Sequence, residues 1–83
     1  MSLSPETVDA LQTALASEHA AIWAYGLAGA FLPAASDAAL AKGSEVHTVR
    51  RDATIATLKG SGATPKAESV SFMSVMNRVG PQT

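Results

Sequence analysis

The chain has 83 residues with seven acidic and six basic side chains, which gives a net charge of −1. This length allows one small domain, and the absence of cysteine excludes disulfides, thiolate zinc sites and thiol chemistry. Because no basic or acidic block is present, we expect no binding to nucleic acid or to an anionic membrane surface.

A long first helix is predicted over about residues 5–32. Ser4 suits the N-cap, Pro5 suits the first helical position, and Glu6 opposes the positive end of the helix dipole. Pro33 ends this helix because its ring clashes with the preceding turn. The opening has no basic segment ahead of an apolar one, so it is not read as a signal peptide and we expect a cytoplasmic protein.

Along this helix, apolar residues recur in alternating steps of three and four, the pattern that a helix turns toward a partner helix. The stripe consists of Val8, Leu11, Leu15, Glu18, Ile22, Tyr25, Gly29 and Leu32. Its one charged member is Glu18, and an unpartnered carboxylate in apolar surroundings costs several kcal/mol. Glu18 therefore needs a cation, a metal, hydrogen-bond donors or its own proton.

Small residues form further rows on the same helix, namely Ala20, Ala24 and Ala28, with Gly26 and Ala30 adjoining. Gly26 and Gly29 each cost about 1 kcal/mol relative to alanine, so the close approach of another helix is the expected reason for them. Residues 19–36 carry no formal charge, but their alanine and glycine content and the absence of flanking positive charge favour a buried helix over a membrane span.

A second helix is predicted over about residues 37–59, with Ser36 as its N-cap and Gly60 at its end. The candidate inward positions are Leu40, Ser44, His47, Arg51, Thr54 and Leu58, with an adjacent row of Ala39, Gly43, Val46, Arg50 and Ala53. Polar residues fall at its centre. They lie level with Glu18 if the two helices form an antiparallel hairpin.

Residues 62–83 are predicted to form a turn-rich connector and then a short helix, whose apolar positions are Phe72, Val75, Met76 and Val79. An extended segment over residues 70–72 is the alternative. Two long helices and a short tail leave one face of the hairpin uncovered. We therefore expect an all-α fold with a single domain over residues 1–83, a long antiparallel hairpin that dimerises into a four-helix bundle. A different protein that supplies the other half is the alternative.

Three segments carry a family resemblance: Leu-Ala-Ser-Glu-His-Ala-Ala-Ile-Trp-Ala-Tyr-Gly at 15–26, His-Thr-Val-Arg-Arg-Asp-Ala at 47–53, and Gly-Ala-Thr-Pro at 62–65. They resemble the motifs of bacterial ferritin-like domains of unknown function. The resemblance covers about residues 8–72 and implies a ferritin-like helical bundle without implying an activity. The second pair of helices of that domain is missing here. We therefore expect either a half-domain that dimerises or a piece of a longer protein.

Ferritin-like di-iron and di-manganese proteins bind metal through a glutamate on one helix and Glu-x-x-His on the next. This chain offers Glu18 and His47, but Ser44 stands where the second carboxylate is expected. Glu45 is one residue away and about 100° round the helix. Within one chain the ligand set is incomplete. Two copies of Glu18 and His47 about a dimer axis would give a site suited to iron, manganese or zinc.

The favoured interpretation of the polar centre is a structural one. The candidate members of a buried network are Glu18, His19, His47, Arg50, Arg51 and Asp52. One arginine is expected to pair with Glu18, since its planar guanidinium matches a carboxylate, and a cation there would repel a metal ion. We therefore expect a non-enzymatic structural or interaction module with no catalytic residue and no cofactor. A dimer that binds iron, manganese or zinc is the alternative.

Overall fold

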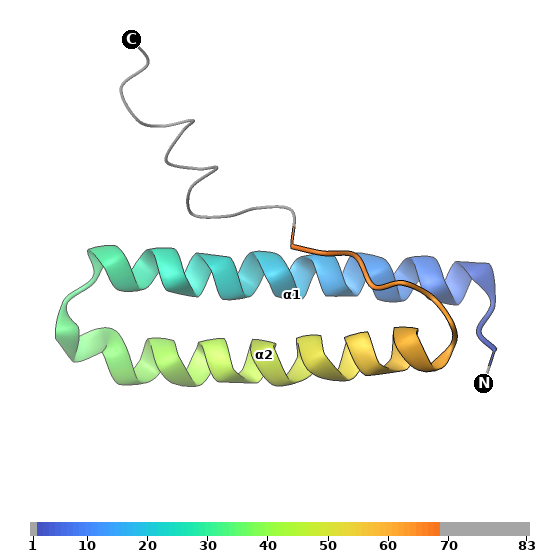
Figure 1. Cartoon of the computed structure of the whole chain (residues 1–83). Helices are drawn as coiled ribbons and strands as arrows, with labels where there is room; N and C mark the ends of the chain where they lie inside the picture. Colours follow the sequence, from blue (N-terminus) through green and yellow to red (C-terminus); the bar gives the residue numbers. More distant parts are fainter. Residues whose placement is uncertain (1, 69–83) are drawn as a thin grey trace, which may run out of the picture.

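The structure, a computed structural model, describes residues 2–68, which form an antiparallel helical hairpin (Figure 1). Helix α1 spans Pro5–Phe31, the short 3-10 helix η1 spans Ala34–Ser36, and α2 spans Asp37–Gly60. Because no strand occurs among the described residues, the all-α prediction is confirmed for them. None of the helices in this part is long and apolar enough to cross a membrane. The predicted tail helix lies outside the described residues.

Helix α1 begins as its sequence indicates. The Ser4 side chain accepts a hydrogen bond from the backbone N–H of Thr7 at 3.2 Å, and Pro5 occupies the first turn. At the other end, the N–H of Leu32 bonds to the carbonyl of Ala28 at 2.9 Å, after which the backbone is extended. Phe31 is therefore the last residue of the helix. Leu32, which precedes Pro33, is already extended, as the residue before a proline usually is.

The two ends of α2 differ from the prediction. Ser36 makes no side-chain capping bond, because η1 already has helical backbone angles there and leads straight into α2. Ser36 therefore occupies the predicted N-cap position of α2 but does not cap the helix with its side chain. At the C-terminal end, Gly60 is still helical and Ser61 follows it. The left-handed residue is Gly62, with φ +87°, a conformation that favours glycine.

The interface between the helices is narrow. One leucine from each helix, Leu15 on α1 and Leu58 on α2, is completely buried, and Glu18 is 7% exposed. On α2, the remaining positions of the first predicted inward row, Leu40, Ser44, His47, Arg51 and Thr54, are half-buried. The adjacent row was predicted wrongly except at Gly43, because Ala39, Val46, Arg50 and Ala53 are exposed. The far end of the α1 stripe is not covered by the described residues, since Gly29 and Leu32 are exposed.

Candidate functional site

Glu18 lies at the middle of α1 and both of its carboxylate oxygens are paired. His47 donates from Nδ1 to Oε1 at 2.6 Å, and Arg50 places Nε 2.8 Å from Oε2. Because a carboxylate only accepts hydrogen bonds, Nδ1 of His47 carries the proton in this contact. His47 and Arg50 are one turn apart on α2, so the two donors converge on a single acceptor of the facing helix.

The three side chains of this cluster differ in their exposure to solvent. The Glu18 side chain is 9% exposed and that of His47 is 25% exposed, whereas that of Arg50 is 62% exposed. Arg50 therefore runs from the outside of α2 to the buried carboxylate. Charge-assisted bonds of this kind are stronger than neutral ones, and here they satisfy a carboxylate that would otherwise be buried without partners.

An aromatic contact continues the cluster toward the loop end of the hairpin. The rings of Tyr25 and His47 have centroids 5.6 Å apart and are tilted by 38°. Gly43, one turn before His47, makes room for the tyrosine, because a Cβ there would lie 2.5 Å from Cε1, Cζ and Oη of Tyr25. Sequence reasoning missed this role of Gly43. The available signal was a glycine one turn from a central histidine.

The sequence analysis instead predicted that another helix approaches closely at two glycines of α1. The described residues do not show such an approach. A Cβ added to Gly26 would meet nothing within 4 Å, and one added to Gly29 would meet Leu40 Cδ1 at 4.0 Å, an ordinary contact. That prediction is therefore wrong for the hairpin itself. Of the glycines in the two long helices, Gly43 on α2 is the one whose missing Cβ makes room for a side chain of the facing helix.

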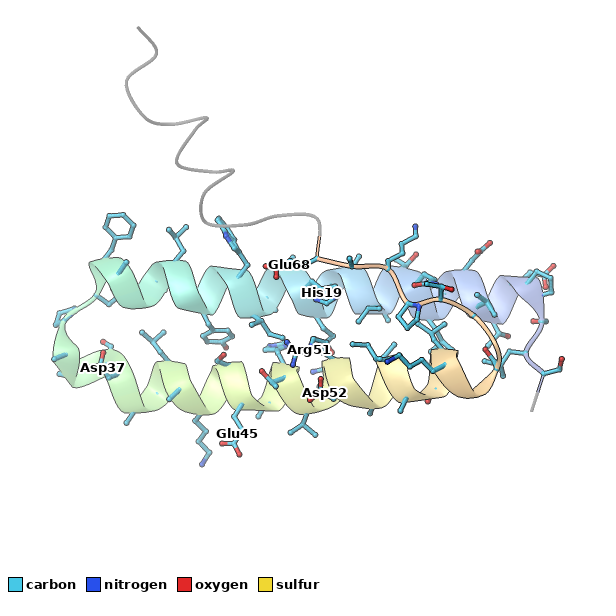
Figure 2. All side chains as sticks on the ribbon, viewed as in Figure 1. His19, Asp37, Glu45, Arg51, Asp52 and Glu68 are labelled. Atoms are coloured by element: carbon cyan, nitrogen blue, oxygen red, sulfur yellow. The ribbon has the colours of Figure 1, made fainter. Side chains whose placement is uncertain are left out.

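Two predicted members of the network form a separate pair. Arg51 places Nε and Nη2 each 2.9 Å from Asp52 Oδ1. Figure 2 shows Arg51 between the two helices, while the Asp52 side chain is 62% exposed. The structure therefore brings together Glu18, His47 and Arg50, and it places the Arg51–Asp52 pair outside that cluster.

His19 serves the connector that follows α2 and has no hydrogen bond to Glu18 among the described residues. Its Nε2 lies 3.2 Å from the carbonyl of Lys66. Gln12 holds the same segment twice, donating to the Thr64 carbonyl at 2.8 Å and accepting from the Lys66 N–H at 2.9 Å. These bonds lay the connector along α1 (Figure 1). Sequence reasoning missed Gln12, although it lies seven residues before His19 and hence on the same face.

A ferritin-like metal centre does not fit the residues of one hairpin. Within residues 2–68, no three histidine, cysteine, aspartate or glutamate side chains converge as a metal-ligand group. The two predicted ligands, Glu18 and His47, are bonded to each other, and Arg50 pairs with the second carboxylate oxygen. A metal at this position would need ligands from a second copy and would displace these contacts.

Together these features define an all-α hairpin whose helices are joined at mid-length by a buried carboxylate. The chain belongs to the family described as Domain of unknown function (DUF4439), which matches residues 10–79. The matched range includes Glu18, His47 and Arg50. The family description names neither a fold nor an activity, so the ferritin-like assignment stays a prediction. No curated protein and no solved structure matches the chain.

Proposed function

We propose that the protein is a non-enzymatic structural module whose hairpin associates with a second copy of itself. The observation that supports this is the exposure of its apolar side chains. In the described part of the chain, the fully buried hydrophobic residues are Leu15 and Leu58, whereas Phe31, Leu32, Val46 and Val49 are 47–78% exposed. A helix pair buries an apolar face only against another layer. Two hairpins bring four helices together, the number in the ferritin-like bundles that the motifs resemble.

In this proposal the Glu18 cluster holds the two helices of each hairpin together. Both carboxylate oxygens have donors, and one of these donors is the guanidinium of Arg50. A metal dication brought to Glu18 would meet the positive charge of Arg50 at short range, which is unfavourable in a partly buried site. The contacts therefore support a structural role for the cluster over a metal-binding role.

Size-exclusion chromatography with light scattering tests the self-association directly. The full chain is measured across a series of micromolar concentrations, with circular dichroism to establish that it is folded. The expected result is a mass twice that of the chain, falling toward the monomer on dilution. A well-folded monomer at every concentration would contradict the proposal.

The alternative is a metal-binding dimer, and one contact favours it: Glu18 and His47 come from facing helices and lie side by side. Two such pairs in one assembly would provide two carboxylates and two imidazoles, a donor set suited to iron, manganese or zinc. Elemental analysis of protein purified without chelator separates the two functions. One metal ion or more per dimer would support the alternative. Metal well below that level, without uptake when iron or manganese is added, would exclude it.

A further inference from the structure

The outer face of α2 carries an apolar row that the hairpin does not use. Its positions are Ala39, Lys42, Val46, Val49, Ala53 and Ala56, and all of them are exposed. They alternate in steps of three and four, as the a and d positions of a coiled coil do. Glu45, which flanks the row, projects from α2 on the side away from α1 (Figure 2). The row therefore faces away from the helix that α2 already contacts.

A shallow hollow lies on this row. It is lined by Lys42, Glu45, Val46, Val49 and Arg50. In a parallel coiled coil, the side chain at an a position inserts between four residues of the facing helix, at the preceding d and g positions and the adjoining a and d positions. With Val46 at position a, those four residues are Lys42, Glu45, Val46 and Val49, and all four line the hollow. The hollow thus has the composition that would receive Val46 of a second copy.

The charges that flank the row agree with the same arrangement. Glu45 falls at position g and Arg50 at the following position e, five residues later. In a parallel pair, the g residue of one helix lies beside the next e residue of the other. Glu45 therefore faces Arg50 of the second copy, and two-fold symmetry makes this contact twice. In an antiparallel pair, g residues lie beside g residues and e residues beside e residues, so Glu45 would not face Arg50 of the second copy.

We infer that α2 packs in parallel against α2 of a second copy along this row, with Glu45 of each copy bonded to Arg50 of the other. The inference rests on the proposed self-association and names its surface. Because Arg50 also bonds Glu18, the second copy contributes a carboxylate to each Glu18 cluster. Lys42 is the one charged member of the row. Its stem covers apolar surface while its ammonium reaches water, and a single such position can fix the register.

Analytical ultracentrifugation of two aspartate variants of the full chain tests the surface. Val49→Asp places a charge in the row and is expected to weaken dimerisation roughly 100-fold or more. Ala41→Asp is the matched control, since Ala41 is exposed on the same helix but lies off the row, and it should dimerise like the wild type. Glu45→Lys removes two attractive contacts and should weaken the dimer roughly tenfold at low salt.

Cysteine crosslinking tests the parallel orientation, and the chain has no cysteine of its own. Val46→Cys should form a disulfide-linked dimer under mild oxidation, because the two a positions meet across a parallel pair. Ala41→Cys, exposed on the same helix but off the row, should not. Crosslinking only in a mixture of Val46→Cys and Val49→Cys would overturn the orientation. If Val49→Asp still dimerises, the proposed α2 contact surface is wrong, but self-association is not. If the wild type is monomeric, both proposals are wrong.

Discussion

Nδ1 of His47 lies 2.6 Å from Oε1 of Glu18, across 29 residues of sequence, and joins the two helices at mid-length. On one side of this contact each helix buries a leucine, and on the other side Tyr25 rests against Gly43. His47 and Arg50 are one turn apart, so sliding α2 by one turn would leave only one of the two donors beside Glu18 and one carboxylate oxygen buried without a partner. Since that is costly, the contact fixes the register of the hairpin.

We predict that Glu18→Gln lowers the free energy of unfolding by about 1–3 kcal/mol. Breaking one side of a fully buried ion pair costs about 3–5 kcal/mol. The expected loss is smaller here because the Arg50 side chain is 62% exposed and can be hydrated once its partner is gone. Urea unfolding followed by circular dichroism measures the loss. Asp52→Asn is the control, and its exposed pair with Arg51 should contribute less than about 1 kcal/mol.

Replacing both members of the pair separates a structural cluster from a metal site. We predict that Glu18→Leu with Arg50→Met recovers much of the stability lost in Glu18→Gln, because the double change leaves no unpaired charge. The half-buried His47 can then donate to water. Urea unfolding with and without chelator provides the measurement. If Glu18 is a metal ligand, the double variant gains nothing over the single one, and chelator destabilises only the wild type.

Alanine substitution at Gly43 on α2 and at Gly26 on α1 should change the stability of the protein in opposite directions. Gly43→Ala drives the ring of Tyr25 off its position and is expected to lower stability by about 1–2 kcal/mol. Gly26→Ala meets nothing within 4 Å in the described structure and should gain up to about 1 kcal/mol of helix propensity. Thermal melts of the two variants check the signs. Equal effects would show that Tyr25 does not depend on the space at Gly43.

Local signals were sufficient to predict the helices. Ser4, Pro5 and Pro33 set the limits of α1 through capping and steric rules that act within one turn. The all-α fold followed from the three-and-four spacing. The predicted end of α2 was less accurate, because both Gly60 and Gly62 can adopt a left-handed conformation and the structure has it at Gly62.

The candidate site was only partly predictable, since its partners depend on the rotation of one helix against the other. The sequence left open whether Arg50 or Arg51 pairs with Glu18. The hairpin brings Arg50 to Glu18 and leaves Arg51 with Asp52. A rotation of about 100° separates consecutive residues on a helix, so this choice requires the packing angle between α1 and α2, which periodicity alone does not give.

Gln12 offers a test of how the connector is held. We predict that Gln12→Leu raises hydrogen exchange at the Lys66 amide, because the side chain accepts that N–H at 2.9 Å, and lowers global stability by only about 1 kcal/mol. Gln12→Glu keeps an acceptor for Lys66 and loses the donor to the Thr64 carbonyl. It should therefore keep the Lys66 amide protected. Exchange at Lys66 that is the same in the wild type and Gln12→Leu would contradict this account.

Lys42 provides the most direct way to strengthen the proposed α2 contact. At its d position, the two Lys42 ammonium groups of a parallel dimer lie near each other and interrupt the apolar row with charge. Lys42→Leu removes this repulsion and adds apolar area to the row, so the dissociation constant of the dimer should fall roughly tenfold or more, about 1.4 kcal/mol. Ala41→Leu is the control, since Ala41 is exposed on the same helix and lies off the row and its flanks. Sedimentation equilibrium of both variants gives the constants. A dimer that is unchanged or weakened by Lys42→Leu would show that the outer row of α2 is not the contact surface.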